Sequence, residues 1–271
     1  MKEFEFRRPR SVAEAASLMA AVPDARPLAG GMTLIPSMKL RLSEPPALID
    51  LRGVSGMRGV QSGQGGLSIG AMTPHAEVAA SPLVSAAIPA LAALAGGIGD
   101  PQVRNRGTIG GSLAASDPSA DYPAAVLALE ARVVTDRRSI PASDYFRGMF
   151  ETALAPGELI TQVEFPVPAA AAYQKFRSPA SRYALVGVFV ARTAKGVRVA
   201  VTGAAACVFR ASALEAALEE KFSPEALSGV RYPAVDLNTD MHGDAEFRAH
   251  LIGVLTRRAV EKILAAGGSA R

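Results

Sequence analysis

The chain has 271 residues, of which 49% are hydrophobic and 20% charged, and its formal net charge is +4. These values are ordinary for a globular protein, and the length suits two or three subdomains around a sizeable core. The positive charges are scattered along the chain, whereas a nucleic-acid-binding surface needs them clustered on one face, so we predict no nucleic-acid partner.

A single cysteine, Cys207 in VTGAAACVF, limits the redox chemistry of the chain itself. One cysteine makes no intrachain disulfide, and an iron–sulfur cluster needs about four thiolates, so we expect neither here. We interpret Cys207 as a small buried strand residue. The N-terminal MKEFEFRRPR contains acidic residues and no apolar segment, so we predict no secretory signal and a cytoplasmic protein.

The first 50 or so residues alternate between strand-like and helix-like stretches. Ser11 precedes apolar residues at helical spacing and is a predicted N-cap. Strands separated by helices over so short a length favour a small parallel sheet. The expected elements are strand, helix, strand, helix and strand, in the stretches FEFRRP, SVAEAASLMAAVP, ARPLAGG, TLIPSMKLRL and ALIDL.

The middle of the chain starts with GMRGVQSGQGGLSIGAMT, whose glycines predict an antiparallel hairpin. No residue between Glu77 and Asp100 is charged, but prolines, serines and glycines interrupt this run. We therefore predict two buried helices here, VAASPLV and AIPALAALAG, and no membrane span, which needs about 20 apolar residues. Next come a predicted helix, DYPAAVLALEA, a strand, RVVTD, and an edge strand, ELITQVEFPVP.

The run from Pro166 to Ala172, PVPAAAA, is the strongest candidate for a domain boundary. After it, YALVGVFVAR and VRVAVTGAAACVF predict strands, and ASALEAALEEKF and DAEFRAHLIGVLTRRAVEKIL predict helices. Phe247, Leu251 and Leu255 recur every four residues in the last helix, and we expect them to form its buried stripe.

Several catalytic and cofactor motifs are absent from the sequence. There is no P-loop, no H-E-x-x-H and no G-x-G-x-x-G, because Gln102 follows Gly97-Ile98-Gly99 where the third glycine should stand. GVSG around Ser55 is not a G-x-S-x-G nucleophile elbow. The three histidines are far apart, and His250 is expected to have a surface or capping role. We therefore predict no catalytic residue and no metal ligand.

Two glycine pairs, Gly30-Gly31 in PLAGGMTLIP and Gly110-Gly111 in TIGGSLAASD, are candidate anion-binding loops. Glycine lets a ligand approach main-chain N–H groups, and successive free N–H groups near a helix start bind an anion without any lysine. Strand-to-helix turns also carry glycine for conformational reasons alone, and for each pair taken singly this alternative stays open. Hydroxyl groups flank both pairs, from Thr33, Thr108 and Ser112, and would suit a diphosphate.

Two aspartates, Asp117 and Asp121, follow the second glycine pair. A carboxylate beside a diphosphate is unfavourable, so we expect these residues to reach a neutral hydroxylated group such as ribityl or ribose. The alternatives are a turn before Pro118 for Asp117 and the N-cap of the next helix for Asp121. We predict the cap, which does not exclude ligand contact.

Three long stretches closely resemble the FAD-binding medium subunit of the molybdenum hydroxylases, which include carbon monoxide dehydrogenase and the xanthine dehydrogenase family. The similarity covers almost the whole chain in the right order. The stretches are LAGGMTLIPSMKLRL, GDPQVRNRGTIGGSLAASDPSADYPAAVLALEA and YQKFRSPASRYALVGV, and VRVAVTGAAACVF and AEFRAHLIGVLTRRAV are also similar to that subunit's C-terminal domain.

The resemblance implies an α+β fold with a two-subdomain FAD-binding domain of the vanillyl-alcohol-oxidase-like (PCMH) type. Its first subdomain, residues 1–55, would hold a small parallel sheet with helices, and its second, residues 56–170, an antiparallel sheet with helices. Residues 171–271 would form a small C-terminal α+β domain of the carbon monoxide dehydrogenase flavoprotein type.

The resemblance also implies an FAD site. The loops Leu28 to Leu34 and Thr108 to Ser112 would hold the diphosphate, and Asp121 would meet the ribityl or a nearby part of FAD. Family members often carry Gln-Ser or His-Ser after the first glycine pair, so the contact of Met32 is expected through its backbone N–H. The full expected set is Leu28, Ala29, Gly30, Gly31, Met32, Thr33, Leu34, Ile98, Thr108, Gly110, Gly111, Ser112, Asp117, Asp121, Ile160, Lys175 and Tyr183.

In this family the medium subunit passes electrons and performs no hydroxylation itself. The resemblance therefore implies a large molybdenum–pterin partner subunit and a small partner subunit with two [2Fe–2S] clusters, in a heterotrimer that is often doubled. The alternatives are a flavin-free structural subunit of the same kind of complex and a stand-alone flavin oxidoreductase. The absence of a nearby His or Cys for covalent flavin attachment argues against the last.

Overall fold

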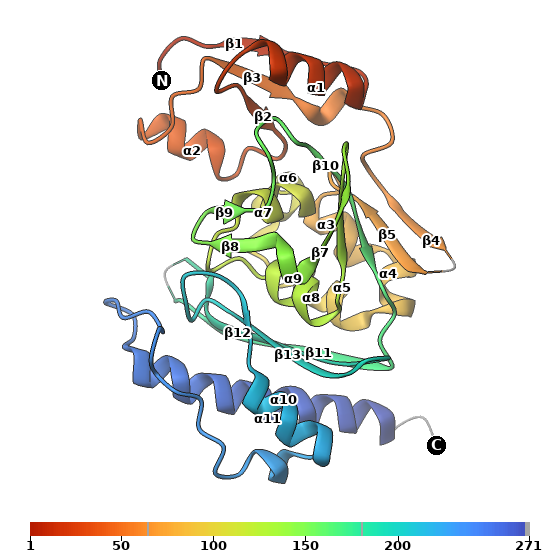
Figure 1. Cartoon of the computed structure of the whole chain (residues 1–271), viewed down its shortest axis with the longest axis vertical. Helices are drawn as coiled ribbons and strands as arrows, with labels where there is room; N and C mark the ends of the chain where they lie inside the picture. The colour runs from red at the N-terminus through yellow and green to blue at the C-terminus, as the bar shows by residue number, and fades with distance from the viewer. Residues whose placement is uncertain (64, 180, 269–271) are drawn as a thin grey trace.

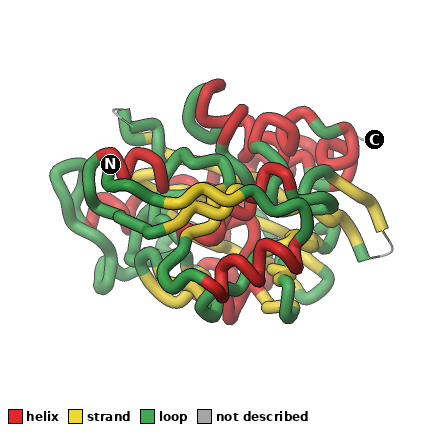
Figure 2. Tube along the Cα trace, turned by 90° about the horizontal axis from the view of Figure 1, so that it is seen from above, coloured by secondary structure: helices red, strands yellow, loops and turns green. Residues whose placement is uncertain are grey.

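The computed structural model describes residues 1–63, 65–179 and 181–268, and its elements are stacked in three tiers. Figure 1 shows the N-terminal strands and helices at one end of the long axis, a mixed middle tier, and a C-terminal sheet with two helices at the other end. Viewed from above, in Figure 2, the hairpin of β4 (Val60–Gly63) and β5 (Gly66–Gly70) projects beyond the rest of the molecule.

The N-terminal tier is the predicted small parallel sheet, with strand order β1-β3-β2. The Ser11 side chain accepts a hydrogen bond from the Glu14 N–H, so the predicted helix cap is confirmed. The second helix is shorter than predicted, because Arg41 takes a left-handed φ of 58° and the chain turns there. The elements are β1 (Glu5–Arg7), α1 (Val12–Ala21), β2 (Arg26–Leu28), α2 (Leu34–Lys39), β3 (Ala47–Asp50) and η1 (Leu51–Gly53).

The middle tier contains an antiparallel sheet with strand order β4-β5-β10-β6-β7. The predicted hairpin is confirmed, but the prediction of an edge strand at ELITQVEF is wrong, since β10 pairs with β5 on one side and β6 on the other. A short two-stranded ribbon, β8-β9, stands apart. The remaining elements are β6 (Arg132–Thr135), β7 (Ser139–Pro141), α9 (Ala142–Tyr145), β8 (Phe146–Gly148), β9 (Glu151–Thr152) and β10 (Ile160–Phe165).

Six short helices connect β5 to β6. The uncharged run forms three helices where two were predicted, because Ser81 ends α3 and its side chain caps α4 at Pro82. The predicted loop from Thr108 to Ser112 forms the N-cap and first turn of α7, and α6 lies just before it, where no element was predicted. The six are α3 (His75–Ala80), α4 (Pro82–Ala87), α5 (Pro89–Gly96), α6 (Pro101–Arg106), α7 (Ile109–Ala115) and α8 (Tyr122–Ala128).

The C-terminal tier is a four-stranded antiparallel sheet with order β11-β12-β13-β14. The long helix α11 packs on β11 and β12, while α5 and α8 of the middle tier pack on the opposite face, as Figure 1 shows. The elements are β11 (Ala170–Arg177), β12 (Ala184–Thr193), β13 (Gly196–Thr202), β14 (Phe209–Arg210), α10 (Ser212–Glu220), η2 (Pro224–Leu227) and α11 (Ala245–Gly268).

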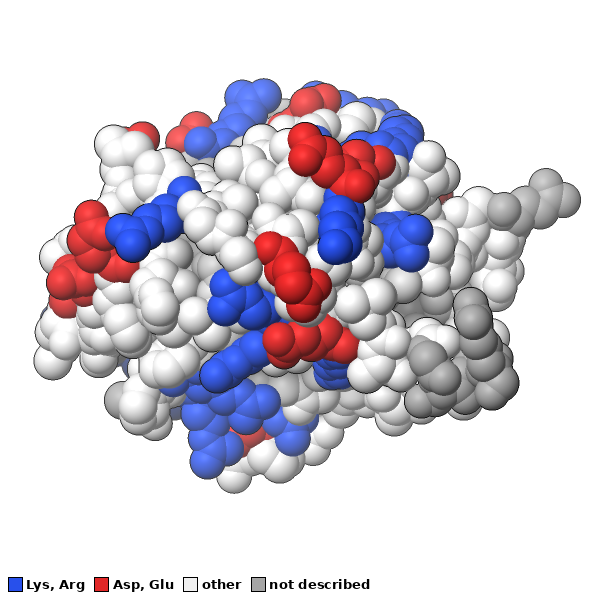
Figure 3. Space-filling view, turned by 90° about the horizontal axis from the view of Figure 1, so that it is seen from below, with Lys and Arg blue, Asp and Glu red and all other residues white. Residues whose placement is uncertain are grey.

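Two predictions for this tier are wrong. The stripe of α11 is buried at Leu251 and Leu255, but Phe247 is 39% exposed and packs edge-on against Phe176. Cys207 is only half-buried and lies in a bend between β13 and β14, outside any strand. In Figure 3, Lys and Arg lie beside Asp and Glu over much of the underside, in agreement with the scattered charge of the sequence.

The largest cluster of buried apolar side chains runs through all three tiers, for example through Ile49, Ile69, Val163 and Phe189. A second cluster lies between the C-terminal sheet and its helices α10 and α11. The boundaries at residues 55/56 and 170/171 therefore stay a prediction, and residues 269–271 lie outside the described part. No helix in the described ranges is both long and apolar enough to cross a membrane.

Candidate functional site

A cavity of about 980 Å³ lies where the N-terminal and middle tiers meet. Its wall is built from the loop between β2 and α2, the start of α7, strand ends of the middle sheet, and a turn of the C-terminal tier that includes Tyr183. This volume is at the upper end of the range for cofactor and small-molecule sites, about 300–1,000 Å³, and suits an extended ligand.

The loop from Gly30 to Thr33 lines this cavity and contains four consecutive backbone N–H groups. None of the four has a hydrogen-bond partner among the residues that the structure describes. Gly31 adopts a φ of 75°, which glycine tolerates best, and a Cβ on Gly30 would lie 2.1 Å from the carbonyl oxygen of Arg106. The two glycines thus permit the turn and its close approach to the end of α6, and the amides stay free for an anionic ligand.

The second glycine pair is built differently, because it lies inside the first turn of α7. Every N–H from Ile109 to Ser112 already has a partner: Thr73 O, Ala71 O, Thr108 Oγ1 and Thr108 O, in chain order. The expectation that this loop also offers free N–H groups is therefore wrong. A Cβ on Gly110 would lie 2.5 Å from the Ala71 Cβ, and one on Gly111 would lie 3.5 Å from the Ala29 Cβ. Gly110 thus allows α7 to pack closely on Ala71, just after β5, whereas a Cβ on Gly111 would crowd the Thr108 hydroxyl at 2.9 Å and make only an ordinary contact with the first loop.

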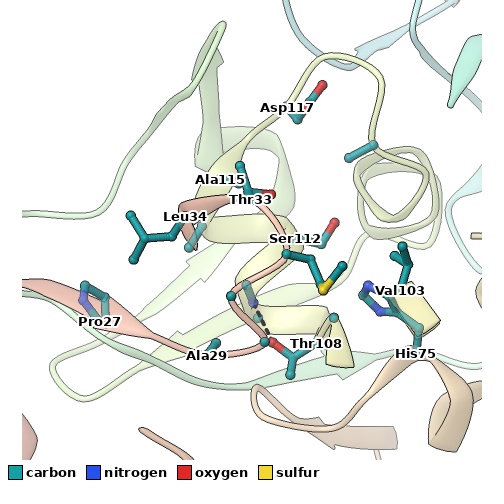
Figure 4. A pocket seen from close by; sticks show the side chains of 18 of the residues that line it. Pro27, Ala29, Thr33, Leu34, His75, Val103, Thr108, Ser112, Ala115 and Asp117 are labelled. Atoms are coloured by element: carbon teal, nitrogen blue, oxygen red, sulfur yellow. Dashed lines mark hydrogen bonds between the residues drawn. The ribbon is translucent and has the colours of Figure 1, made fainter. Parts of the chain in front are cut away.

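Hydroxyl groups complete the part of the cavity between the two loops. The Thr33 and Ser112 hydroxyls have no hydrogen-bond partner within the described ranges. In the view of Figure 4, both side chains lie between Leu34 on one side and His75 with Val103 on the other. Free amides together with free hydroxyls form a neutral, donor-rich site that fits phosphate oxygens.

The structure brings all but two of the predicted site residues to this one cavity. Leu28 is instead buried beside Met38 and Leu48, and Lys175 is held by Asp121. The predicted residues that line the cavity are Ala29, Gly30, Gly31, Met32, Thr33, Leu34, Ile98, Thr108, Gly110, Gly111, Ser112, Asp117, Asp121, Ile160 and Tyr183.

Asp121 is the centre of a buried polar group that joins α8 to β11. Lys175 Nζ lies 2.9 Å from both carboxylate oxygens of Asp121, and the Tyr173 hydroxyl donates to Oδ1 at 2.5 Å. The Lys175 side chain is only 6% exposed. Burial raises the pKa of Asp121, and Lys175 and Tyr173 counteract this shift. Burying either charge alone would carry a large desolvation cost, and the attraction between the two charges offsets it.

The two aspartates have different local roles. Asp117 accepts a hydrogen bond from the Ser119 N–H, which is the turn role considered as an alternative. Asp121 stands at the start of α8, but its side chain makes no capping hydrogen bond, so the predicted cap is wrong. The side chain is directed instead to Tyr173 and Lys175, which lie 52 and 54 residues later in the chain, respectively.

Other cavity residues were not predicted from the sequence. Glu158 accepts hydrogen bonds from Arg138 and Thr135, and the Arg138 guanidinium lowers its pKa to about 2. Phe150 is an exposed aromatic residue with a left-handed φ of 56°. His75 is buried in the wall, so the prediction that no histidine lies near the flavin site is wrong. No local motif distinguishes these residues, and in the described part no three His, Cys, Asp or Glu side chains are grouped to hold a metal ion.

Comparison with known proteins gives matches along nearly the full chain. Residues 2–168 match the family model described as the FAD binding domain in molybdopterin dehydrogenase, and residues 171–263 match the CO dehydrogenase flavoprotein C-terminal domain. The chain is 35% identical to the carbon monoxide dehydrogenase medium chain of Hydrogenophaga pseudoflava, over 95% of this chain and 96% of that one. It is also 35% identical to the nicotine 6-hydroxylase medium subunit of Paenarthrobacter nicotinovorans, over 94% of this chain and 95% of the relative.

Solved structures show the same similarity in three dimensions. Carbon monoxide dehydrogenase from Hydrogenophaga pseudoflava, solved in a form that lacks the Mo-pyranopterin moiety, contains a chain that matches with a TM-score of 0.88 at 35% identity, covering 97% of this chain and 98% of that one. A chain of quinoline 2-oxidoreductase from Pseudomonas putida 86 also matches with a TM-score of 0.88, at 30% identity and covering 98% and 99%.

Proposed function

Since this chain belongs to the family of FAD-binding medium subunits of molybdenum hydroxylases, we propose that it passes electrons from the [2Fe–2S] clusters of a partner subunit to an external acceptor. When bound, FAD supplies the redox chemistry, and the protein binds it, orients it and excludes competing reactions. The observation that carries the proposal is the donor-rich loop from Gly30 to Thr33 at the wall of a cavity large enough for a dinucleotide.

The geometry supports a specific division of labour among the cavity residues. The free amides of Gly30 to Thr33 would bind the diphosphate, and the Thr33 and Ser112 hydroxyls would donate to it. Met32 contributes its backbone N–H, as expected for a side chain without a polar group. The first turn of α7 contributes shape and the Ser112 hydroxyl, because its own amides are occupied.

The far part of the cavity suits the flavin and its ribityl chain. Asp121 has lone pairs beyond those that accept from Lys175 and Tyr173, because a carboxylate accepts about four hydrogen bonds. It can therefore still accept from a ribityl hydroxyl, and Lys175 would act by holding it in place. Ile98, Ile160 and Tyr183 would supply apolar and aromatic contacts to the rings.

Two observations support electron transfer between subunits over independent catalysis. The single thiol of the chain cannot bind an iron–sulfur cluster, which fits a division of labour in which another subunit carries the clusters. Met32, Phe150 and Tyr183 line the cavity and are exposed, which gives its mouth an apolar rim suited to a partner. We propose a large molybdenum–pterin subunit and a small [2Fe–2S] subunit in a cytoplasmic heterotrimer that forms dimers.

The experiment is expression of the chain alone and with its partner subunits, followed by a visible absorption spectrum after FAD addition and gel filtration. We expect a flavin spectrum at about one FAD per chain, and no substrate turnover without the partners. A chain that takes up no flavin in either form would favour the structural-subunit alternative. Turnover by the isolated chain would favour the stand-alone oxidoreductase.

A further inference from the structure

His75, the first residue of α3, is a polar residue in the cavity wall to which the fold gives no partner. The side chain lines the cavity, and the residue is only 5% exposed. Its Nδ1 is buried and makes no hydrogen bond to any described residue. Buried polar side-chain atoms are nearly always hydrogen-bonded in proteins, so an unpaired imidazole in a ligand cavity requires an explanation.

Gly107 lies so close to the imidazole of His75 that a side chain at position 107 would collide with it. Gly107 has φ −62° and ψ 139°, a conformation open to any residue, so backbone strain does not require glycine here. A Cβ at this position would lie 2.5 Å from His75 Nε2 and 2.9 Å from its Cδ2. The backbone N–H of His75 also donates to the Gly107 carbonyl at 2.9 Å. Nε2 therefore lies beside a residue that itself lines the cavity.

The ring of Tyr122, the first residue of α8, packs against the imidazole of His75. The ring centroids are 5.3 Å apart, and the Tyr122 hydroxyl is also buried and without a partner in the described part. Buried waters typically bind polar groups that would otherwise be unsatisfied, so one water between the two neighbouring rings could bond to both groups.

The protonation of the imidazole follows from its surroundings. Burial, and then the positive charge of Arg104, lower the pKa of His75 to about 4, so the ring is neutral at physiological pH. A neutral imidazole has one N–H and one acceptor nitrogen. A hydroxyl or water donating to Nδ1 makes Nδ1 the acceptor and leaves the proton on Nε2, the nitrogen beside Gly107.

We propose that His75 is a further cofactor-binding residue, which donates a hydrogen bond from Nε2–H to an oxygen atom of FAD, and that Tyr122 is the positioning residue that fixes its tautomer through a buried water at Nδ1. This inference rests on the proposed function, because it assigns a contact of the same cavity. It extends the site beyond the glycine loops to the α3–α8 contact.

The first test uses the full chain labelled with ¹⁵N-histidine, in which only three histidines give signals. The ¹⁵N shifts distinguish a protonated from an unprotonated ring nitrogen. We expect the Nε2–H tautomer for His75 before and after FAD addition, with a change at Nε2 on binding. A proton on Nδ1, or no change at Nε2, would contradict the donor role. In Tyr122→Phe we expect a mixture of tautomers, and an unchanged tautomer would remove Tyr122 from the proposal.

The second test compares His75→Phe, which keeps an aromatic ring without a donor, with His75→Gln, whose amide N–H can replace Nε2–H. FAD affinity is measured by quenching of flavin fluorescence. We expect His75→Phe to weaken binding about ten- to hundredfold, the range for a lost hydrogen bond to a charged acceptor. His75→Gln should stay within about threefold of wild type, because it restores the donor. His250→Phe, at an exposed position on α11, is the matched control.

The outcomes separate this inference from the proposed function. If the wild-type chain binds FAD and His75→Phe binds it equally well, the role of His75 is refuted and the proposed function stands. If His75→Phe keeps affinity while His75→Gln loses it, His75 only fills space. If the wild-type chain binds no FAD, both fail together. Should His75→Phe not fold, the labelled wild-type chain and His75→Gln still decide.

Discussion

At the scale of single residues, His75 also couples the stability of the chain to pH. Its pKa is about 4 in the folded protein, where burial is the main cause, against 6.5 for an unperturbed histidine. The unfolded chain therefore binds a proton at a pH at which the folded chain does not. The contribution to stability is fully present above about pH 6.5 and is lost as the pH falls toward about 4.

We predict that His75→Phe reduces this pH dependence. For the chain without FAD, the difference in pKa corresponds to about 3 kcal/mol of unfolding free energy lost between pH 7 and pH 4. Urea unfolding at pH 7, 5.5 and 4 should show a smaller decrease for His75→Phe than for wild type. His250→Phe should keep the wild-type decrease. Equal decreases in all three proteins would show that the imidazole titrates normally.

Asp121 illustrates what the local sequence can and cannot predict for one residue. Its position as the first residue of DYPAAVLALEA correctly predicted the start of a helix. The direction of its side chain depends on Tyr173 and Lys175, which come from a strand more than 50 residues later. No local pattern contains that pairing, so the capping bond was predicted in place of a buried ion pair.

At the scale of elements, the two glycine pairs are similar in sequence but differ in structure. Gly30-Gly31 lies in an open loop with free amides, whereas Gly110-Gly111 lies in a helical turn whose amides are all bonded. Thr108 accepts from the Gly111 and Ser112 N–H groups as the N-cap, and the carbonyls of Ala71 and Thr73 accept from the other two amides. We therefore propose the anion-binding role for the first loop and not for the second.

We predict that Gly30→Ala weakens FAD binding more than tenfold. The new Cβ would lie 2.1 Å from the Arg106 carbonyl oxygen, so the loop must move and its four amides with it. Overpacking of this kind should also cost about 1–3 kcal/mol of stability. The control is Gly253→Ala on α11, where a Cβ meets no atom within 4 Å. Fluorescence titration with FAD tests the prediction, and unchanged affinity of Gly30→Ala would refute the role of the loop.

The elements that were predicted correctly are those with a clear local period. The parallel N-terminal sheet, the β4–β5 hairpin and α11 follow from apolar spacing and turn residues. The central place of β10 was missed because its alternation indicates a half-buried strand without giving the number of its neighbours. Helices α6 and α7 were missed because glycines and polar residues hide their short turns. Strand β11 was missed because its first residues are the alanines of the predicted domain boundary.

At the scale of the whole molecule, the cavity depends on the C-terminal tier. The segment from α7 to α8 carries Asp117 and Asp121 along one side of the cavity. The Thr202 hydroxyl lies within hydrogen-bond distance of the Pro118 and Ala120 carbonyls, and the Gly203 N–H donates to Pro118. The end of β13 therefore fixes this segment. The predicted boundary near residue 170 lies between the middle sheet and the C-terminal sheet. The cavity wall nevertheless depends on contacts with the C-terminal sheet.

The Asp121–Lys175 ion pair also connects the cavity wall to the C-terminal sheet. Its removal tests whether the cavity depends on that sheet. We predict that Lys175→Met destabilises the chain by about 3–5 kcal/mol, because the buried carboxylate is left without its cation. The double variant Asp121→Asn/Lys175→Met should regain most of that stability, since both charges are gone. Arg58→Met, which breaks the exposed pair with Glu77, should cost less than about 1 kcal/mol. Urea unfolding at pH 7 measures the stability of all three variants. FAD titration should show weaker binding by Lys175→Met than by Arg58→Met. If Lys175→Met lost no more stability than Arg58→Met, the two tiers would be held by their apolar core, and the ion pair would be incidental.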